Sequence, residues 1–163
     1  MKKTLILLSV LAFTVAATTA QEISDNAIGL RIGGNTGFGT EISYQRAIFD
    51  SNRLEFGLGL RNASNFSAFR VSGVYQWVWL LDGNFNWYAG AGASIGSFNL
   101  DDNFPNRNDF NTLFINAAGN IGIEYNFDFP LLLSLDFRPE LSIINDIDNS
   151  LEFQVALGAR YQW

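Results

Sequence analysis

The chain has 163 residues, enough for one domain, and 48% of them are hydrophobic. Ten lysine and arginine residues against sixteen aspartate and glutamate residues give a formal net charge of −6, which argues against the basic surface that nucleic-acid binding needs. The sequence contains no histidine and no cysteine, so a histidine-activated serine cannot be built and disulfide bonds cannot form.

The first twenty residues have the pattern of a secretory signal. A cationic start, Met1-Lys2-Lys3, precedes an apolar run from Leu5 to Val15, and small residues follow at 16–20. The run is short of the roughly 20 apolar residues that a membrane-spanning helix needs. We therefore expect residues 1–20 to be a cleaved signal peptide and residues 21–163 to form one β-barrel domain. Losing Lys2 and Lys3 would change the net charge from −6 to −8.

The segments after the signal alternate between apolar and polar side chains, which is the period of a β-strand. The first two are residues 27–34 and 40–45, separated by the turn-forming residues Asn35-Thr36-Gly37. Asp50-Ser51-Asn52 then precedes the third segment, 54–61, whose alternation is the cleanest. These patterns predict three successive antiparallel strands.

Five more segments follow with the same period. The fourth, 67–80, is separated from the fifth, 85–96, by the hairpin signal Asp82-Gly83. A polar stretch, 97–111, follows, and the remaining segments are 112–125, 131–141 and 151–163. The even number of segments, with short connections alternating with longer ones, predicts an all-β fold, an eight-stranded antiparallel up-and-down transmembrane β-barrel.

Aromatic residues gather at one level of this predicted barrel. If both termini are periplasmic, every tryptophan lies near the periplasmic interface, where amphipathic rings favour the headgroup region. A soluble core would have no reason to collect them at one level. The predicted interfacial girdle consists of Tyr44, Trp77, Trp79, Trp87, Tyr125, Tyr161 and Trp163.

The inward face of the predicted strands carries charges among small and polar residues. A soluble core would not tolerate so many charges, because each desolvated charge costs several kcal/mol unless it is paired. A narrow barrel can pair them across its lumen. The predicted lumen charge network consists of Arg31, Glu41, Glu55, Arg61, Arg70, Glu124, Asp136, Arg138, Glu140, Glu152 and Arg160.

The last segment, with its alternation and its final aromatic Trp163, resembles the closing strand of bacterial outer-membrane barrels. The whole pattern is similar to the membrane domain of outer membrane protein A and to outer membrane protein X. This resemblance implies a location in the bacterial outer membrane, contact with membrane lipid, a monomeric barrel, and insertion by the barrel-assembly machinery through the C-terminal strand. Its external loops are candidates for contact with an extracellular partner.

No enzyme, cofactor or metal site is predicted. Barrels of this size that deacylate or palmitoylate lipid A use a histidine with a serine, and this sequence has no histidine. The acidic stretches 101–103 and 145–149 lack the glycine and terminal glutamate of an EF-hand loop. We expect a structural or adhesive role expressed through the external loops. Two alternatives are a small pore or transport-associated barrel, and a secreted lipocalin-like ligand binder, which would need an apolar interior.

Overall fold

The computed structural model describes residues 23–33, 39–63, 66–100, 111–144 and 151–163. The expected signal peptide and both acidic stretches lie outside these residues, so the expectations about them stay predictions. Within the described ranges, no helix is long and apolar enough to cross a membrane.

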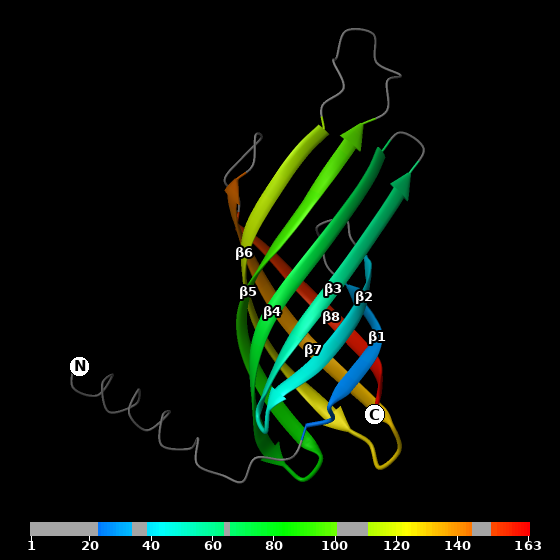
Figure 1. Cartoon of the computed structure of the whole chain (residues 1–163), viewed down its shortest axis with the longest axis vertical. Helices are drawn as coiled ribbons and strands as arrows, with labels where there is room; N and C mark the ends of the chain where they lie inside the picture. The colour runs from blue at the N-terminus through cyan, green and yellow to red at the C-terminus, as the bar shows by residue number, and fades with distance from the viewer. Residues whose placement is uncertain (1–22, 34–38, 64–65, 101–110, 145–150) are drawn as a thin grey trace, which may run out of the picture.

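Eight antiparallel strands form one closed barrel in the order β1 to β8, with β8 paired to β1 (Figure 1). Each strand pairs with its neighbours in the sequence, as expected for an up-and-down barrel. The strands are β1 Asn26–Gly33, β2 Thr40–Phe49, β3 Asn52–Ala63, β4 Phe66–Asp82, β5 Phe85–Leu100, β6 Asn111–Asn126, β7 Leu131–Ile144 and β8 Leu151–Gln162. The predicted fold class is therefore confirmed.

Most strands are longer than the alternation predicts, and the difference lies at their ends. β3 begins at Asn52 rather than at Leu54, and β5 continues to Leu100 instead of ending at Gly96. Residues such as Asn52 and Ser97 favour turns in isolation, but the neighbouring strand supplies a partner for their backbone groups. Pairing across the sheet thus extends strands into sequence that favours loops.

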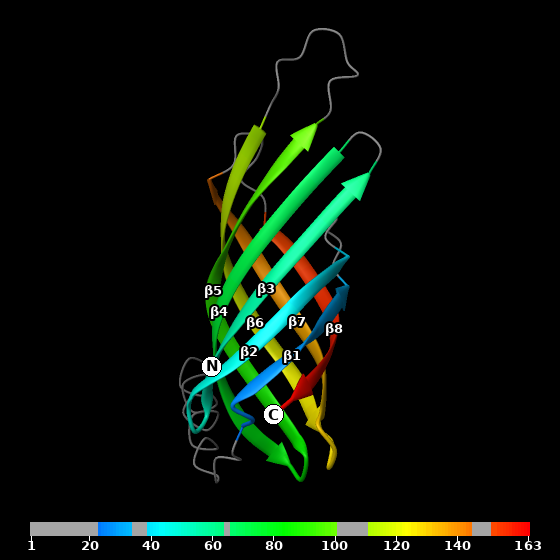
Figure 2. The ribbon, with the colours of Figure 1, turned by 45° about the vertical axis from the view of Figure 1, so that its right-hand side comes forward.

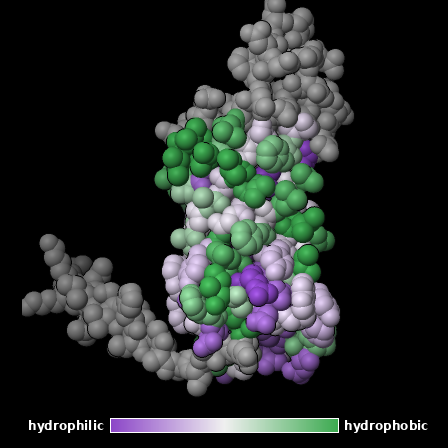
Figure 3. All heavy atoms as spheres, in the orientation of Figure 1, coloured by the Kyte–Doolittle hydropathy of each residue, from purple (hydrophilic) through white to green (hydrophobic). Residues whose placement is uncertain are grey.

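Over most of each strand, side chains alternate between the outside and the lumen, and the register shifts at Ala47/Phe49, Leu80/Asp82 and Ile115/Asn116 interrupt the pattern. On β8, Leu157 is 64% exposed, whereas its neighbour Ala156 is 2% exposed. Figure 3 shows the apolar side chains covering the middle and upper outer surface in this view, with hydrophilic residues gathered at the lower end. An apolar exterior around a polar interior is stable only where lipid replaces water outside.

The two ends of the barrel differ. Short connections join β2 to β3, β4 to β5 and β6 to β7 at the lower end in Figure 1, where the C-terminus also lies. Gly83 in the β4–β5 turn has φ +52°, a backbone conformation that favours glycine. At the other end the wall is uneven, because β1 and β2 end lower than β3, β4, β5 and β6 (Figure 2).

Candidate functional site in the lumen

Ten charged side chains are buried inside the described part of the barrel. Five are arginines, Arg31, Arg53, Arg70, Arg138 and Arg160, and five are carboxylates, Glu41, Glu55, Glu124, Asp136 and Glu140. Each belongs to an ion pair with a member of the opposite group. The two groups balance in number, so these ten buried groups have no formal net charge.

Glu55 on β3 accepts hydrogen bonds from four side chains. Its Oε1 accepts a hydrogen bond from Arg138 Nη2 at 2.7 Å, and its Oε2 accepts from Arg160 Nη2 at 3.3 Å. Two amides, Gln45 Nε2 at 2.7 Å and Gln76 Nε2 at 3.2 Å, also donate to Oε2. Hydrogen bonds to a charged acceptor are the strong ones, so Glu55 links β3 to β2, β4, β7 and β8.

A second set of contacts joins β1 to the far wall. Arg31 Nη2 donates to Asp136 Oδ1 at 2.6 Å, and its Nε lies 3.1 Å from both carboxylate oxygens. Arg31 Nη1 also lies 3.5 Å from Glu41 Oε2, and Glu41 pairs in turn with Arg70. Arg70 Nη1 reaches Glu140 Oε2 at 3.2 Å. A chain of alternating charges therefore runs from β7 through β1, β2 and β4 and back to β7.

Arg53 is a member of the network that the sequence pattern does not predict. Its Nη2 lies 2.6 Å from Glu124 Oε2, its Nε donates to Gln76 Oε1 at 2.7 Å, and its guanidinium lies 5.0 Å from the centroid of the Tyr88 ring. The predicted strand begins one residue later, which leaves Arg53 between the predicted turn, Asp50-Ser51-Asn52, and that strand. Its spacing from Glu55, two residues away on the same face, is the signal that indicates a lumen position.

Two predicted network residues are not fully buried. Arg61 is exposed at the upper part of β3, so it is not among the buried charges, and Glu152 is only half-buried near the same end of β8. Both lie on the inward rows by alternation, and each is close to the end of its strand. The other nine predicted residues are buried in it.

Glycines leave the space that the long charged side chains occupy. A Cβ on Gly57 would overlap Ser72 and come within 3.2 Å of Glu41 Oε2, and a Cβ on Gly158 would overlap the Arg160 guanidinium. An eight-stranded barrel is only just wide enough for its interior side chains. The glycines on the inward rows therefore set which charges fit side by side.

No metal centre is evident among the described residues, since no group of three or more acidic side chains is arranged to hold an ion. The buried carboxylates face arginines instead. Among the described residues the interior thus holds charges against one another, whereas a lipocalin-like binder needs an apolar interior.

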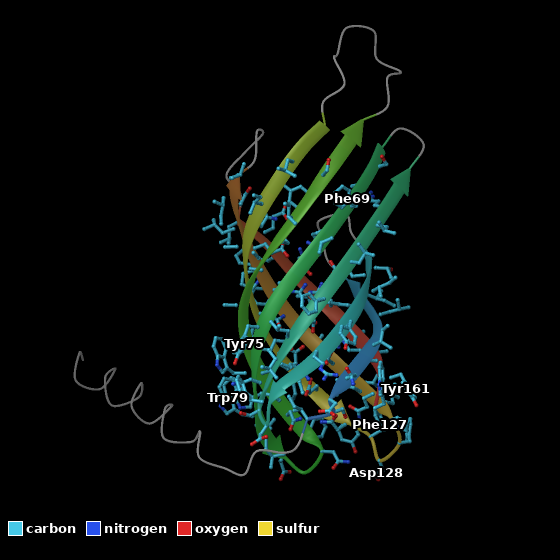
Figure 4. All side chains as sticks on the ribbon, viewed as in Figure 1. Phe69, Tyr75, Trp79, Phe127, Asp128 and Tyr161 are labelled. Atoms are coloured by element: carbon cyan, nitrogen blue, oxygen red, sulfur yellow. The ribbon has the colours of Figure 1, made fainter. Side chains whose placement is uncertain are left out.

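The predicted girdle residues occupy the outward rows near the short turns. Trp79 and Trp87 stack with ring centroids 4.3 Å apart, and Tyr161 and Trp163 stack at 5.9 Å. Tyr44 and Tyr161 both pair with Ile28 of β1, and Trp77 lies next to Tyr75 at 5.0 Å. Tyr125 lies 4.7 Å from both Phe85 and Phe127. Figure 4 places Trp79, Phe127 and Tyr161 at the same end of the barrel as Asp128, with Phe69 toward the other end.

Comparison with solved structures identifies the architecture. The chain is similar to Neisserial surface protein A, with a TM-score of 0.62, 14% identity, and coverage of 85% of this chain and 95% of that one. It is similar to the N-terminal β-barrel domain of Pseudomonas aeruginosa OprF, with a TM-score of 0.64, 13% identity, and coverage of 86% and 100%. The fold is that of the small outer-membrane β-barrels.

A third similar structure is Ail, the attachment invasion locus protein of Yersinia pestis, with a TM-score of 0.57, 13% identity, and coverage of 86% of this chain and 97% of that one. No family model matches the chain, and no curated protein matches its sequence. The resemblance expected from the strand pattern is therefore confirmed at the level of the fold. This is the architecture of bacterial outer-membrane proteins, which agrees with the location expected from the sequence.

Proposed function

We propose that the chain is an integral protein of the bacterial outer membrane that has neither enzymatic activity nor an open channel. Its barrel serves as a rigid membrane support for the connections at the end opposite the aromatic residues. The observation that carries the proposal is the combination of an apolar exterior with a lumen filled by paired charges. Lipid contact follows from the exterior, and a barrier to ions follows from the interior.

The filled lumen distinguishes this function from that of a pore. Arg138 and Arg160 are among the largest buried side chains, and both reach across the lumen to Glu55. An ion passing through would have to separate these buried charge pairs, and breaking a buried pair costs about 3–5 kcal/mol. The side chains that fill the lumen therefore oppose conduction.

Fractionation and planar-bilayer recording test this function together. The mature protein should be recovered with the outer membrane, and it should give no stable single-channel current. A matched variant, Arg138→Ala with Glu55→Ala, removes one charge of each sign and two large side chains, so its current should exceed that of the parent. Recovery in the soluble periplasm, or stable currents from the unmodified barrel, would contradict the proposal.

Adhesion is the second candidate function, and the similarity in fold to the attachment invasion locus protein favours it. β1, β3, β5 and β7 all run toward the end away from the girdle (Figure 1), so the segments that follow them in the chain, 34–38, 64–65, 101–110 and 145–150, are the candidates for contact with a partner outside the cell. Cells that carry the protein should bind a host surface, and replacing 101–110 with a short glycine and serine linker should reduce that binding. Unchanged binding after replacement of every such connection would exclude this role.

A further inference from the structure

Arg46 stands apart from the other arginines of the described strands. Five of them are buried in the lumen and paired with carboxylates, and Arg61 lies on an inward row. Arg46 is exposed and lies on the outward row of β2, in line with Ile42 and Tyr44. Among the described residues it is the one arginine on the outer surface, and it has no ion pair there.

The position of Arg46 explains how a charge is tolerated on the lipid-facing side. A charged residue at mid-membrane destabilises a barrel strongly, but the cost falls to almost nothing near the interface. Arg46 is two residues from Tyr44, a girdle residue, and its Cα partners are Asn26 and Leu54. The backbone of Asn26 pairs in turn with Trp163. The guanidinium therefore lies at the level where lipid headgroups meet the barrel.

Asn26 fixes the geometry of this small cluster. Its Oδ1 accepts a hydrogen bond from Arg46 Nη1 at 2.8 Å and another from the Tyr44 hydroxyl at 2.8 Å. Because a guanidinium carries five N–H donors, this contact uses one of them. No other hydrogen bond of the Arg46 guanidinium is found within the described part of the chain, so the remaining donors face outward from an anchored group.

We propose that Arg46, oriented by Asn26 and Tyr44, binds the phosphate diester of an anionic phospholipid in the membrane leaflet next to the short turns. Arginine donors match phosphate oxygens in a two-point contact, and anionic lipid gains from a nearby arginine. Asp25, whose carbonyl oxygen accepts a hydrogen bond from Ala47 N, and Asp50 are exposed at the same end and weaken this attraction, but within the described residues neither carboxylate forms an ion pair with Arg46. This inference rests on the proposed membrane location.

Tryptophan quenching by brominated lipids tests it. The barrel is reconstituted in phosphatidylcholine with an equal mole fraction of either brominated phosphatidylglycerol or brominated phosphatidylcholine. The fluorescence of Trp163 is obtained by subtracting the fluorescence of the Trp163→Phe variant from that of the parent protein. Brominated phosphatidylglycerol should quench Trp163 with about a fivefold preference over brominated phosphatidylcholine, as expected for one arginine near the surface.

The variants and controls separate the outcomes. Arg46→Gln should remove the preference, whereas Arg61→Gln, which removes the same charge from the other end, should keep it. Equal quenching by the two lipids in the parent, or a preference that survives Arg46→Gln, would overturn the site. Loss of the preference in inorganic phosphate but not in chloride of equal ionic strength would assign the site to free phosphate instead. Absence of quenching by both lipids would overturn the membrane location itself.

Discussion

Arg138 and Glu55 face each other across the full width of the barrel. Their strands, β7 and β3, are four positions apart in the closed order of eight, yet Arg138 Nη2 lies 2.7 Å from Glu55 Oε1. A contact of this kind can form only when the barrel is closed, because the two strands are remote both in sequence and around the sheet. The lumen pairs therefore stabilise closure as well as filling the interior.

Removing the carboxylate of Glu55 should destabilise the barrel severely. Glu55→Ala removes a carboxylate that both Arg138 and Arg160 contact and leaves their guanidinium groups buried. Breaking a buried ion pair costs about 3–5 kcal/mol. Denaturant unfolding in detergent micelles measures the change in the free energy of unfolding. Glu152→Ala is the control, since Glu152 is half-buried near the strand end. If both substitutions lowered the free energy of unfolding equally, Glu55 would not be more important to stability than a half-buried carboxylate at a strand end.

Arg53 and Glu124 should behave as a coupled pair. Their side chains meet at 2.6 Å between β3 and β6, so Arg53→Met and Glu124→Gln should each destabilise the barrel, while the double variant should cost less than the sum. We expect a coupling energy of about 0.5–3 kcal/mol, measured by a double-mutant cycle in the same unfolding assay. Strict additivity would show that the two groups act independently.

An arginine placed on the lipid-facing surface should destabilise the barrel by an amount that depends on its depth in the membrane. Leu157 is the central outward residue of β8 and is 64% exposed, and Tyr161 lies on the same row near the girdle. Leu157→Arg should cost about 2–4 kcal/mol and Tyr161→Arg about 0–1 kcal/mol. Folding into phospholipid vesicles gives both values. If both substitutions destabilised the barrel equally, the barrel would not lie in the membrane with its predicted girdle at the interface.

The seam between the first and last strands should need glycine at position 29. A Cβ there would overlap the Ala159 carbonyl oxygen and lie 2.6 Å from Arg160 Cα, both of them backbone atoms that cannot move aside alone. Gly29→Ala should therefore cost about 1–3 kcal/mol and lower the fraction of protein that migrates as a folded barrel without heating. Gly73→Ala is the matched control, because nothing lies within 4 Å of its added Cβ. A normal folded fraction for Gly29→Ala would argue against this close approach.

The sequence predicts which face of each strand is buried much better than it predicts contacts. Alternation assigns Leu157 to the outside and Arg160 to the inside because the side-chain period is two. It does not indicate that Arg160 reaches Glu55, since that depends on the stagger of the strands around the closed barrel. The partners follow from tertiary geometry, which no local pattern contains.

Strand ends account for the differences between the predicted network and the set of buried charges. Arg53 is missed because Asp50-Ser51-Asn52 favours a turn, although the pairing of Asn52 with Trp77 extends β3 to include it. Alternation places Arg61 on the inward row but has no information about depth, and its side chain is exposed near the end of β3. The interaction of the last strand with the assembly machinery, the role of the girdle in the membrane and the monomeric state stay predictions.

Among the described residues, the balance of five buried arginines and five buried carboxylates also constrains how the sequence can change. A substitution that removes one charge leaves its partner unpaired in the lumen, so a second substitution has to restore neutrality. Among natural variants of this protein, we therefore expect Arg31 and Asp136, or Arg53 and Glu124, to be lost or exchanged together, while outward residues such as Leu157 vary independently. Substitutions in the lumen would then covary between paired positions that lie far apart in the chain.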